Sequence, residues 1–102
     1  MSIITSKVEN GVLTLFATGR IDSTNAPTAE AEVDAERAAN PHDSVVLDID
    51  NLQYISSAGL RALKRLHITM KKKEGEMVLK NVNRLVMEVF EMTGFAGLFS
   101  FS

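Results

Sequence analysis

Three consecutive apolar residues, Val45-Val46-Leu47, constrain the fold of this chain more than any other segment. They form the centre of a strand predicted from Ser44 to Ile49. A strand in which neighbouring side chains are all apolar is typical of a sheet that is covered on both faces. Such coverage is common where helices pack on a sheet, so the segment favours an α/β fold built around a central strand.

Strand and helix patterns alternate along the rest of the chain. Asn10-Gly11 accepts the positive φ angles of a tight turn and separates two strand-like segments, Ile3–Val8 and Val12–Phe16, which predicts a hairpin. Residues 19–24 and 51–55 are predicted to lie outside the strands. Helices are predicted from the Ser23-Thr24-Asn25 caps to Ala39, from Ser57 to Lys73 and from Val82 to Met92, and short strands at Met77–Leu79 and Leu98–Phe101. This order predicts a single α/β domain over residues 1–102, with a mixed sheet of four to five strands and helices packed against it.

The first and third predicted helices differ in their packing faces. The first is rich in alanine and acidic residues, and its thin apolar stripe consists of Ala26, Ala29 and Val33. Its helix propensity is therefore good, but its packing face is weak. The third helix has a stronger apolar side, made of Val82, Leu85, Val86, Val89 and Phe90.

Composition and charge exclude several classes of protein. The 102 residues carry a net charge of −2, so nucleic acid is not expected as a principal partner. The absence of cysteine excludes disulfides, thiol catalysis and zinc sites built on sulfur. The chain begins without the pattern of a signal peptide, and its longest apolar run is far shorter than the ~20 residues of a membrane span. We therefore expect a cytoplasmic protein that does not enter a membrane.

The segment Tyr54–Arg61 is the most informative for function. It connects the most buried predicted strand to a helix, and loops at the carboxyl ends of strands are where α/β proteins meet ligands and partners. Ser56 or Ser57 is positioned to cap the helix, and Gly59 leaves the first turn unobstructed. Unpaired amides and the positive end of the helix dipole converge there, so a phosphate esterified to Ser57 would be stabilised. From the spacing alone, a serine that only caps the helix is the simpler interpretation.

Four segments, in the right order, resemble signature segments of the STAS domain, the fold of anti-sigma factor antagonists. Tyr54–Arg61 is similar to the Asp-Ser-Ser/Thr-Gly-Leu signature, and Gly19–Asp22 resembles the Gly-Arg/Glu-Leu-Asp turn after the second strand. Val45–Asp50, together with Leu52 and Ile55, matches the hydrophobic strand that leads into the signature, and Phe90–Phe95 resembles the end of the last helix. These segments cover nearly the whole chain, and the resemblance implies a STAS-type fold.

The resemblance also implies a partner switch. In such antagonists the unphosphorylated protein binds an anti-sigma factor that is also a serine kinase with a histidine-kinase-like ATP site. Phosphorylation of the signature serine ends the binding, and a serine phosphatase restores it. By this resemblance Ser57 is the phosphoacceptor, Gly59 the signature glycine and Asp22 the aspartate of the neighbouring loop. A phosphate adds about 1.5 to 2 negative charges, which is enough to disrupt a desolvated contact with an acidic partner.

The signature departs from the family pattern on both sides of Ser57. The usual aspartate before the phosphoacceptor is Ser56 here, and the residue after it is Ala58. The loss of this negative charge changes what a kinase would recognise. It also makes Ser56 an alternative acceptor.

Helical spacing gives the second predicted helix an apolar face and a basic face. Leu60, Leu63, Leu66 and Met70 fall on the side expected in the core. The opposite face carries Arg61, Lys64, Arg65 and Lys72, with Ile68 among them. An isoleucine surrounded by cations suits contact with an acidic partner such as an anti-sigma kinase, and a solvated face with a stray apolar residue is the alternative. The predicted partner-binding residues are Asp22, Ser23, Thr24, Ser56, Ser57, Ala58, Gly59, Leu60, Arg61, Lys64, Arg65 and Ile68.

Other candidate sites are weaker, and two hypotheses about function remain. His42 and His67 lack metal-ligand spacing, so we expect both to be solvated and no metal to bind. No P-loop, Rossmann glycine pattern or Ser-His-Asp arrangement is present, so we expect neither an enzyme nor a cofactor.

The first hypothesis about function is a phospho-regulated antagonist that is monomeric when free. The second is a STAS module without a serine switch, such as an accessory subunit of a lipid or ABC transport system.

Overall fold

Five strands form one mixed sheet, in the order β1-β2-β3-β4-β5, in the computed structural model, which describes residues 2–102. The strands are β1 (Ile4–Glu9), β2 (Val12–Ile21), β3 (Ser44–Ile55), β4 (Met77–Lys80) and β5 (Ser100–Phe101). The hairpin strand β1 is antiparallel to β2, and every other neighbouring pair is parallel. The predicted α/β fold with a mixed sheet is confirmed.

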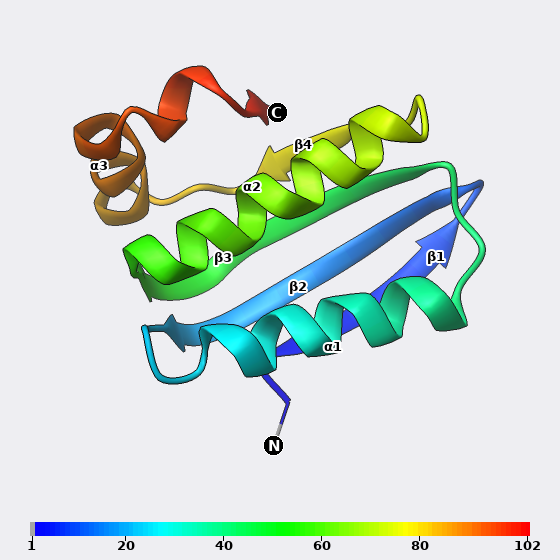
Figure 1. Ribbon diagram of the computed structural model, residues 1–102, viewed down its shortest axis with the longest axis horizontal. Coiled ribbons are helices and arrows are strands. Elements are labelled where there is room, and N and C mark those ends of the chain that lie inside the picture. The colour runs from blue at the N-terminus through cyan, green and yellow to red at the C-terminus, as the bar shows by residue number, and fades with distance from the viewer. Residues whose placement is uncertain (1) are drawn as a thin grey trace.

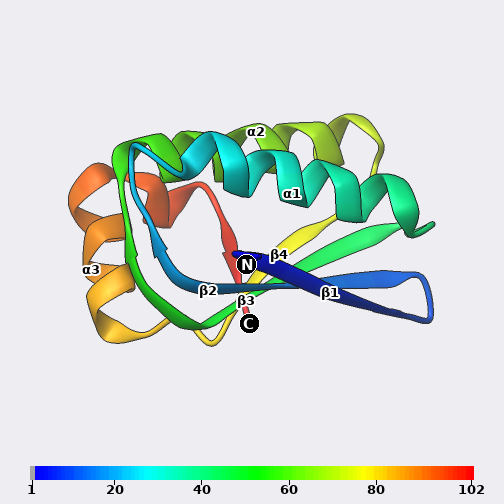
Figure 2. The same cartoon turned by 90° about the horizontal axis from the view of Figure 1, so that it is seen from below.

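The two long helices lie side by side on one face of the sheet (Figures 1 and 2). The helices are α1 (Ala26–Ala39), α2 (Ser57–Lys72) and α3 (Arg84–Thr93), followed by the 3-10 turn η1 (Phe95–Gly97). The third helix, α3, lies at the end of the sheet near the start of α2 (Figure 2), where the Asn83 side-chain amide donates to the carbonyl oxygen of Leu52 at 2.7 Å. None of the helices in residues 2–102 combines the length and apolar character needed to cross a bilayer.

Only one face of the central strand is covered by helices, which corrects the expectation drawn from Val45-Val46-Leu47. Val45 and Leu47 are buried under the helices, whereas Val46 lies on the opposite face and is half-buried. Within residues 2–102 no helix packs on that face (Figure 2). Because side chains alternate along a strand, the run of apolar residues combines a core face with a partly exposed apolar face.

Strands β2 and β3 continue through the segments predicted as breaks. Gly19 has φ of 83°, and the register of β2 against β3 shifts on both sides of residues 18–19, so the strand absorbs a bulge there instead of ending. Pairing continues to Ile21 opposite Ile55. Both strands curl toward the helices at this end (Figure 2), and this curl brings the starts of α1 and α2 together.

The helix boundaries agree with the sequence analysis except at α3. Its first residue is Arg84, because the Asn83 side-chain oxygen accepts a hydrogen bond from the Val86 backbone N–H at 2.9 Å and so caps the helix. Val86 and Phe90 form its buried side, whereas Leu85, expected on that side, is 68% exposed. Two buried residues one turn apart are enough to attach this short helix.

The core consists of the covered sheet face and the apolar stripes of α1 and α2. The predicted stripes are confirmed, since Ala26, Ala29 and Val33 of α1 and Leu60, Leu63, Leu66 and Met70 of α2 are all buried. His67 was expected in solvent, but it is only 8% exposed. Its ring meets the Phe99 ring edge-on, with centroids 5.8 Å apart, because η1 and the chain after it fold back over α2.

Candidate functional site

Three segments meet where β2 and β3 end. They are the loop after Ile21, the pair Ser56-Ser57, and the first two turns of α2 (Figure 1). The Ser56 backbone N–H donates to the Ile21 carbonyl oxygen at 2.8 Å, so the two loops are fixed side by side by the sheet itself. The structure thus brings together the Asp22 loop and the serine pair, which lie more than thirty residues apart in the sequence.

Ser56 has a structural task as the N-cap of α2. Its backbone is extended, with φ of −89° and ψ of 172°, and its hydroxyl oxygen accepts a hydrogen bond from the Gly59 N–H at 3.2 Å. The side chain is half-buried. One of the unpaired amides at the start of the helix is therefore already satisfied by this hydroxyl.

Ser57 is the first residue of α2 and is exposed. Among the side-chain hydrogen bonds of residues 2–102, none involves its hydroxyl, and the positive end of the helix dipole lies beside it. The two serines therefore differ in accessibility and in bonding. Ser57 offers an uncommitted hydroxyl to an approaching protein, and Ser56 does not.

The Asp22 loop is held by bonds within itself. The Asp22 carboxylate accepts hydrogen bonds from the backbone N–H groups of Thr24 and Asn25, both at 2.9 Å. The Asn25 side-chain oxygen accepts from the Asp22 N–H at 2.8 Å, and its side-chain nitrogen donates to the carbonyl oxygen of Arg20, also at 2.8 Å. Asp22 thus shapes the loop, and Ser23 and Thr24 are its exposed tip.

Gly59 and Leu60, two of the predicted partner-binding residues, belong to the core. A Cβ atom on Gly59 would lie 2.7 Å from Cγ1 of Ile55 and 2.8 Å from Cγ2 of Ile21, so only glycine lets the first turn of α2 approach both strand ends this closely. Leu60 is fully buried. These two residues position Ser57 and do not reach the surface themselves, whereas Ala58 is half-buried.

The outer face of α2 is basic. Arg61 and Lys64 are exposed, Ile68 is 40% exposed, and every charged residue from 57 to 73 is a lysine or an arginine. These side chains follow Ser57 along one side of the helix at steps of three and four residues. Ser57 therefore stands at one end of an exposed cationic stripe that contains a single large apolar residue.

Arg65 differs from the other cations because it pairs with α1. Its guanidinium donates two hydrogen bonds to the Glu30 carboxylate, both at 2.7 Å. These hydrogen bonds lower the pKa of Glu30 and raise the pKa of Arg65 relative to their ordinary values. Arg65 was predicted to face a partner, but its charge is already compensated within the molecule.

Arg20 and Tyr54 lie at the same end of the sheet and were not predicted as site residues. The Arg20 guanidinium carbon lies 4.6 Å from the centre of the Tyr54 ring, a cation–π contact, and the two residues are register partners on β2 and β3. Only the continued pairing of these strands could have indicated this contact. Within residues 2–102 no cluster of three or more histidine or carboxylate side chains is arranged to hold a metal.

Comparison with known proteins identifies the family. The family model described as the STAS domain matches residues 4–102. The chain belongs to the STAS-domain family. A Bordetella bronchiseptica protein, BtrV, which carries the name of an anti-sigma factor antagonist, is 37% identical to this STAS domain over 99 residues, which are 97% of this chain and 84% of BtrV.

Solved structures of STAS domains share the fold. A Thermotoga maritima structure described as an anti-sigma factor antagonist superposes with a TM-score of 0.85 at 17% identity, over 96% of this chain and 84% of the other. The antagonist SpoIIAA in its unphosphorylated form gives a TM-score of 0.71 at 12% identity, over 97% of this chain and 86% of the other. Its phosphorylated form, from Bacillus, gives 0.70 at 13% identity, over 97% and 90%.

Proposed function

We propose that this STAS domain is an anti-sigma factor antagonist that binds an anti-sigma factor with serine kinase activity and is inactivated by phosphorylation of Ser57. It would thereby regulate sigma-factor-dependent transcription by partner switching. The observation that carries the proposal is the difference between the two serines. The Ser57 hydroxyl is exposed at the start of α2, and the Ser56 hydroxyl is occupied by the Gly59 N–H. The name of the relative BtrV supports the same function.

The physical basis of the switch is a change of charge on the partner-binding surface. A partner that docks on Arg61, Lys64 and Ile68 must present acidic groups to the cations. A phosphate on Ser57 adds about 1.5 to 2 negative charges to that surface. Arg61 follows Ser57 by one helical turn, so the phosphate would also draw its guanidinium away from the partner.

The switch requires no change of fold. A phosphate at the first residue of α2 would be stabilised by the helix dipole and the remaining unpaired N–H groups. We therefore attribute the proposed release to a local electrostatic effect.

The proposed cycle has two protein partners. One is the anti-sigma factor, a serine kinase with a histidine-kinase-like ATP site, and the other is a serine phosphatase that restores the hydroxyl. The antagonist itself works as a cytoplasmic monomer and needs no cofactor. Its proposed contact residues are now Asp22, Ser23, Thr24, Ser56, Ser57, Ala58, Arg61, Lys64 and Ile68.

The experiment is incubation of the purified protein with its anti-sigma kinase and ATP, followed by mapping of the modified residue by mass spectrometry. We expect one phosphoryl group, on Ser57, in the wild type and in Ser56→Ala, and none in Ser57→Ala. Ser57→Asp should bind the anti-sigma factor at least tenfold more weakly than Ser57→Ala, a loss of about 1.4 kcal/mol or more.

Two outcomes would overturn the proposal. Modification at Ser56 alone would assign the switch to the capping residue. Equal binding of the phosphorylated and unphosphorylated proteins would leave the second hypothesis, a STAS interaction module without a serine switch.

A further inference from the structure

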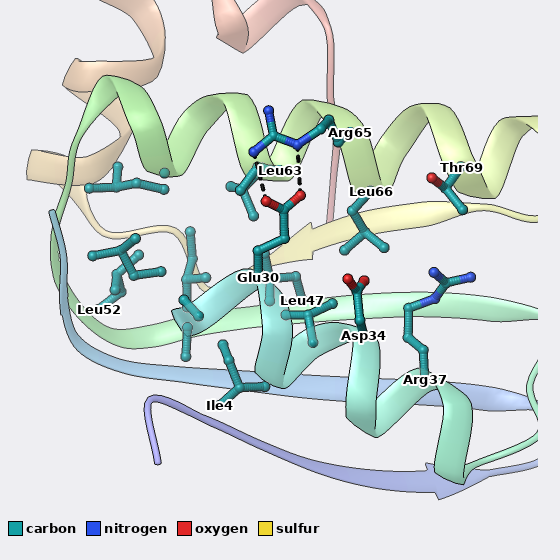
Figure 3. A pocket seen from close by; sticks show the side chains of 18 residues that line it. Ile4, Glu30, Asp34, Arg37, Leu47, Leu52, Leu63, Arg65, Leu66 and Thr69 are labelled. Atoms are coloured by element: carbon teal, nitrogen blue, oxygen red, sulfur yellow. Dashed lines mark hydrogen bonds and ion pairs between the residues drawn. The ribbon is translucent and has the colours of Figure 1, made fainter. Parts of the chain in front are cut away.

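A cavity of about 210 Å³ lies between α1, α2 and the sheet (Figure 3). Its floor is formed by strand residues that include Ile4, Leu47 and Leu52, and Leu63 and Leu66 of α2 line its upper side. The walls are mainly apolar, and the cavity opens to solvent between the two helices. An apolar cavity of this kind stays dry or takes up an apolar group of suitable size.

The cavity exists because the facing helices carry small side chains. Ala29 of α1 and Ala62 of α2 both line it. The packing face of α1 is weak in the sequence, and in the structure this weakness becomes an unfilled space instead of a close helix contact. Interiors are normally packed without such voids, so the space calls for an explanation.

Charged side chains surround the opening. The Glu30–Arg65 pair bridges the two helices over one part of it, and these two charges compensate each other (Figure 3). Asp34 and Arg37 rise from α1 toward α2 beside that bridge (Figure 3). Asp34 is exposed to solvent, whereas Arg37 is half-buried.

Most N–H groups of the Arg37 guanidinium make no hydrogen bond within residues 2–102. Its Nε donates to Nε2 of His42 at 3.4 Å, and within residues 2–102 no carboxylate forms an ion pair with it. The other ring nitrogen of His42 lies 2.6 Å from the carbonyl oxygen of Asn40, which fixes the imidazole behind the arginine. A half-buried guanidinium with unused N–H groups is well suited to bind a carboxylate through two parallel hydrogen bonds.

We propose that this cavity is a binding site for a short- to medium-chain aliphatic carboxylate. The hydrocarbon chain occupies the apolar space between the helices, and the carboxylate pairs with Arg37 at the opening. Of the two arginines that line the opening, Arg65 pairs with Glu30, and Arg37 forms no ion pair within residues 2–102. A mainly apolar enclosure with such a cation at its mouth suits an amphipathic ligand. The proposal is independent of Ser57 and of the partner switch.

The first test is calorimetric titration of the purified protein with saturated carboxylates of six to twelve carbons. The affinity should rise about fourfold for each added methylene until the cavity is full and then level off. Octanol and octylammonium, which lack the negative head group, serve as probes of the arginine contact. They should bind more weakly than octanoate.

Two kinds of variant test the contacts of the ligand's hydrocarbon chain and those of its carboxylate separately. Ala29→Leu and, independently, Ala62→Leu fill the space and should abolish octanoate binding while the circular dichroism spectrum stays native. Arg37→Gln should weaken octanoate binding about tenfold and leave octanol binding unchanged. The matched control is Arg61→Gln, an arginine outside the cavity, which should change neither.

The proposal is wrong if octanoate produces no heat and no shift in the unfolding temperature of the wild type. It is also wrong if octanoate binds folded Ala29→Leu and Ala62→Leu as tightly as the wild type, because the ligand would then lie elsewhere. Equal binding of octanoate to Arg37→Gln and wild type would refute the assigned head-group contact.

Discussion

At the scale of single residues, the two adjacent serines differ in bonding and in exposure. Ser56 ends the strand geometry and caps α2, and Ser57 presents its hydroxyl to solvent. The signature that this segment resembles has an aspartate before the phosphoacceptor, and either an aspartate or a serine oxygen can accept a helix N–H at a cap. The substitution keeps the cap and removes a charge.

This difference predicts that two alanine substitutions change the stability by different amounts. Ser56→Ala should lower the free energy of unfolding by about 1 kcal/mol, since the Gly59 amide loses its cap. Ser57→Ala should change it by less than about 0.5 kcal/mol, since its exposed hydroxyl has no bond to lose. Urea denaturation of both variants beside the wild type measures the difference, and equal losses would contradict the assignment of the cap.

Gly59 gives a second prediction at this scale. Gly59→Ala should destabilise the protein by about 1 to 3 kcal/mol, because the new methyl group would overlap Ile55 and Ile21 at the strand ends. The control is Gly97→Ala in η1, where a Cβ atom would meet nothing within 4 Å. Thermal unfolding of the two variants should therefore differ clearly, and similar melting temperatures would count against the close approach of α2 to the sheet.

The sequence predicted the residue properties that depend on neighbouring residues and missed those that depend on distant contacts. The buried stripe of α2 follows from neighbouring residues and was predicted, and the sequence placed the helix cap at Ser56 or Ser57, of which the structure selects Ser56. The burial of His67 depends on Phe99, and the neutralisation of Arg65 depends on Glu30, 35 positions away. No local pattern contains these contacts, so His67 was expected in solvent and Arg65 was expected on the partner-binding surface.

At the scale of elements, the Glu30–Arg65 pair is the polar connection between α1 and α2. Apart from it, the helices face each other across the small side chains that line the cavity. The Glu30 side chain is 29% exposed and that of Arg65 is 57% exposed, so water screens part of the attraction. The pair therefore aligns the helices more than it stabilises the fold.

The pH dependence of this pair can be predicted in sign. Arg65 lowers the pKa of Glu30, so the pair stabilises the folded state when Glu30 is ionised, and this contribution is lost as the pH falls through the lowered pKa. The difference in free energy of unfolding between wild type and Glu30→Gln should be complete at neutral pH and shrink below about pH 4. Chemical denaturation across this range tests it, and a difference that grows on acidification would contradict the pairing.

The ends of strands were also harder to predict where they depend on pairing with a neighbouring strand. The long strands β2 and β3 were expected to stop early, because Gly19 usually interrupts a strand and residues 51–55 have no clean alternation. Their continuation depends on pairing with each other, from Gly19 opposite Leu52 to Ile21 opposite Ile55. Helix α1 was correctly bounded because Pro27 in its first turn and its Asn40-Pro41 end are local signals, although the Asn25 side chain makes no capping hydrogen bond to the helix.

At the scale of the whole molecule, charge is distributed unevenly in spite of a net charge of only −2. All charged residues of α1 except Arg37 are acidic, and all those of α2 are basic. The two helices lie side by side on the same face of the sheet (Figure 1), so one side of the molecule carries an acidic and a basic band. Net charge alone gave no indication of this arrangement.

This arrangement predicts how association with the anti-sigma factor responds to salt. The association rate should fall as ionic strength rises, because the acidic partner is attracted to the cations of α2. Lys64→Glu should slow association about tenfold at low salt. Lys7→Glu on β1, which makes the same charge change away from α2, is the control, and stopped-flow mixing measures both rates. An equal effect of the two substitutions would place the interface elsewhere.

The uncovered side of the sheet has a practical consequence. Thr5 is exposed on β1 and pairs with Phe16, so its side chain lies on the face opposite to the helices. The chain has no cysteine, so Thr5→Cys would introduce a unique thiol there. A fluorophore or a surface tether attached to that thiol would leave Ser57 and the inter-helix cavity accessible. The sheet face opposite to the helices therefore offers a site at which the molecule can be immobilised in one known orientation.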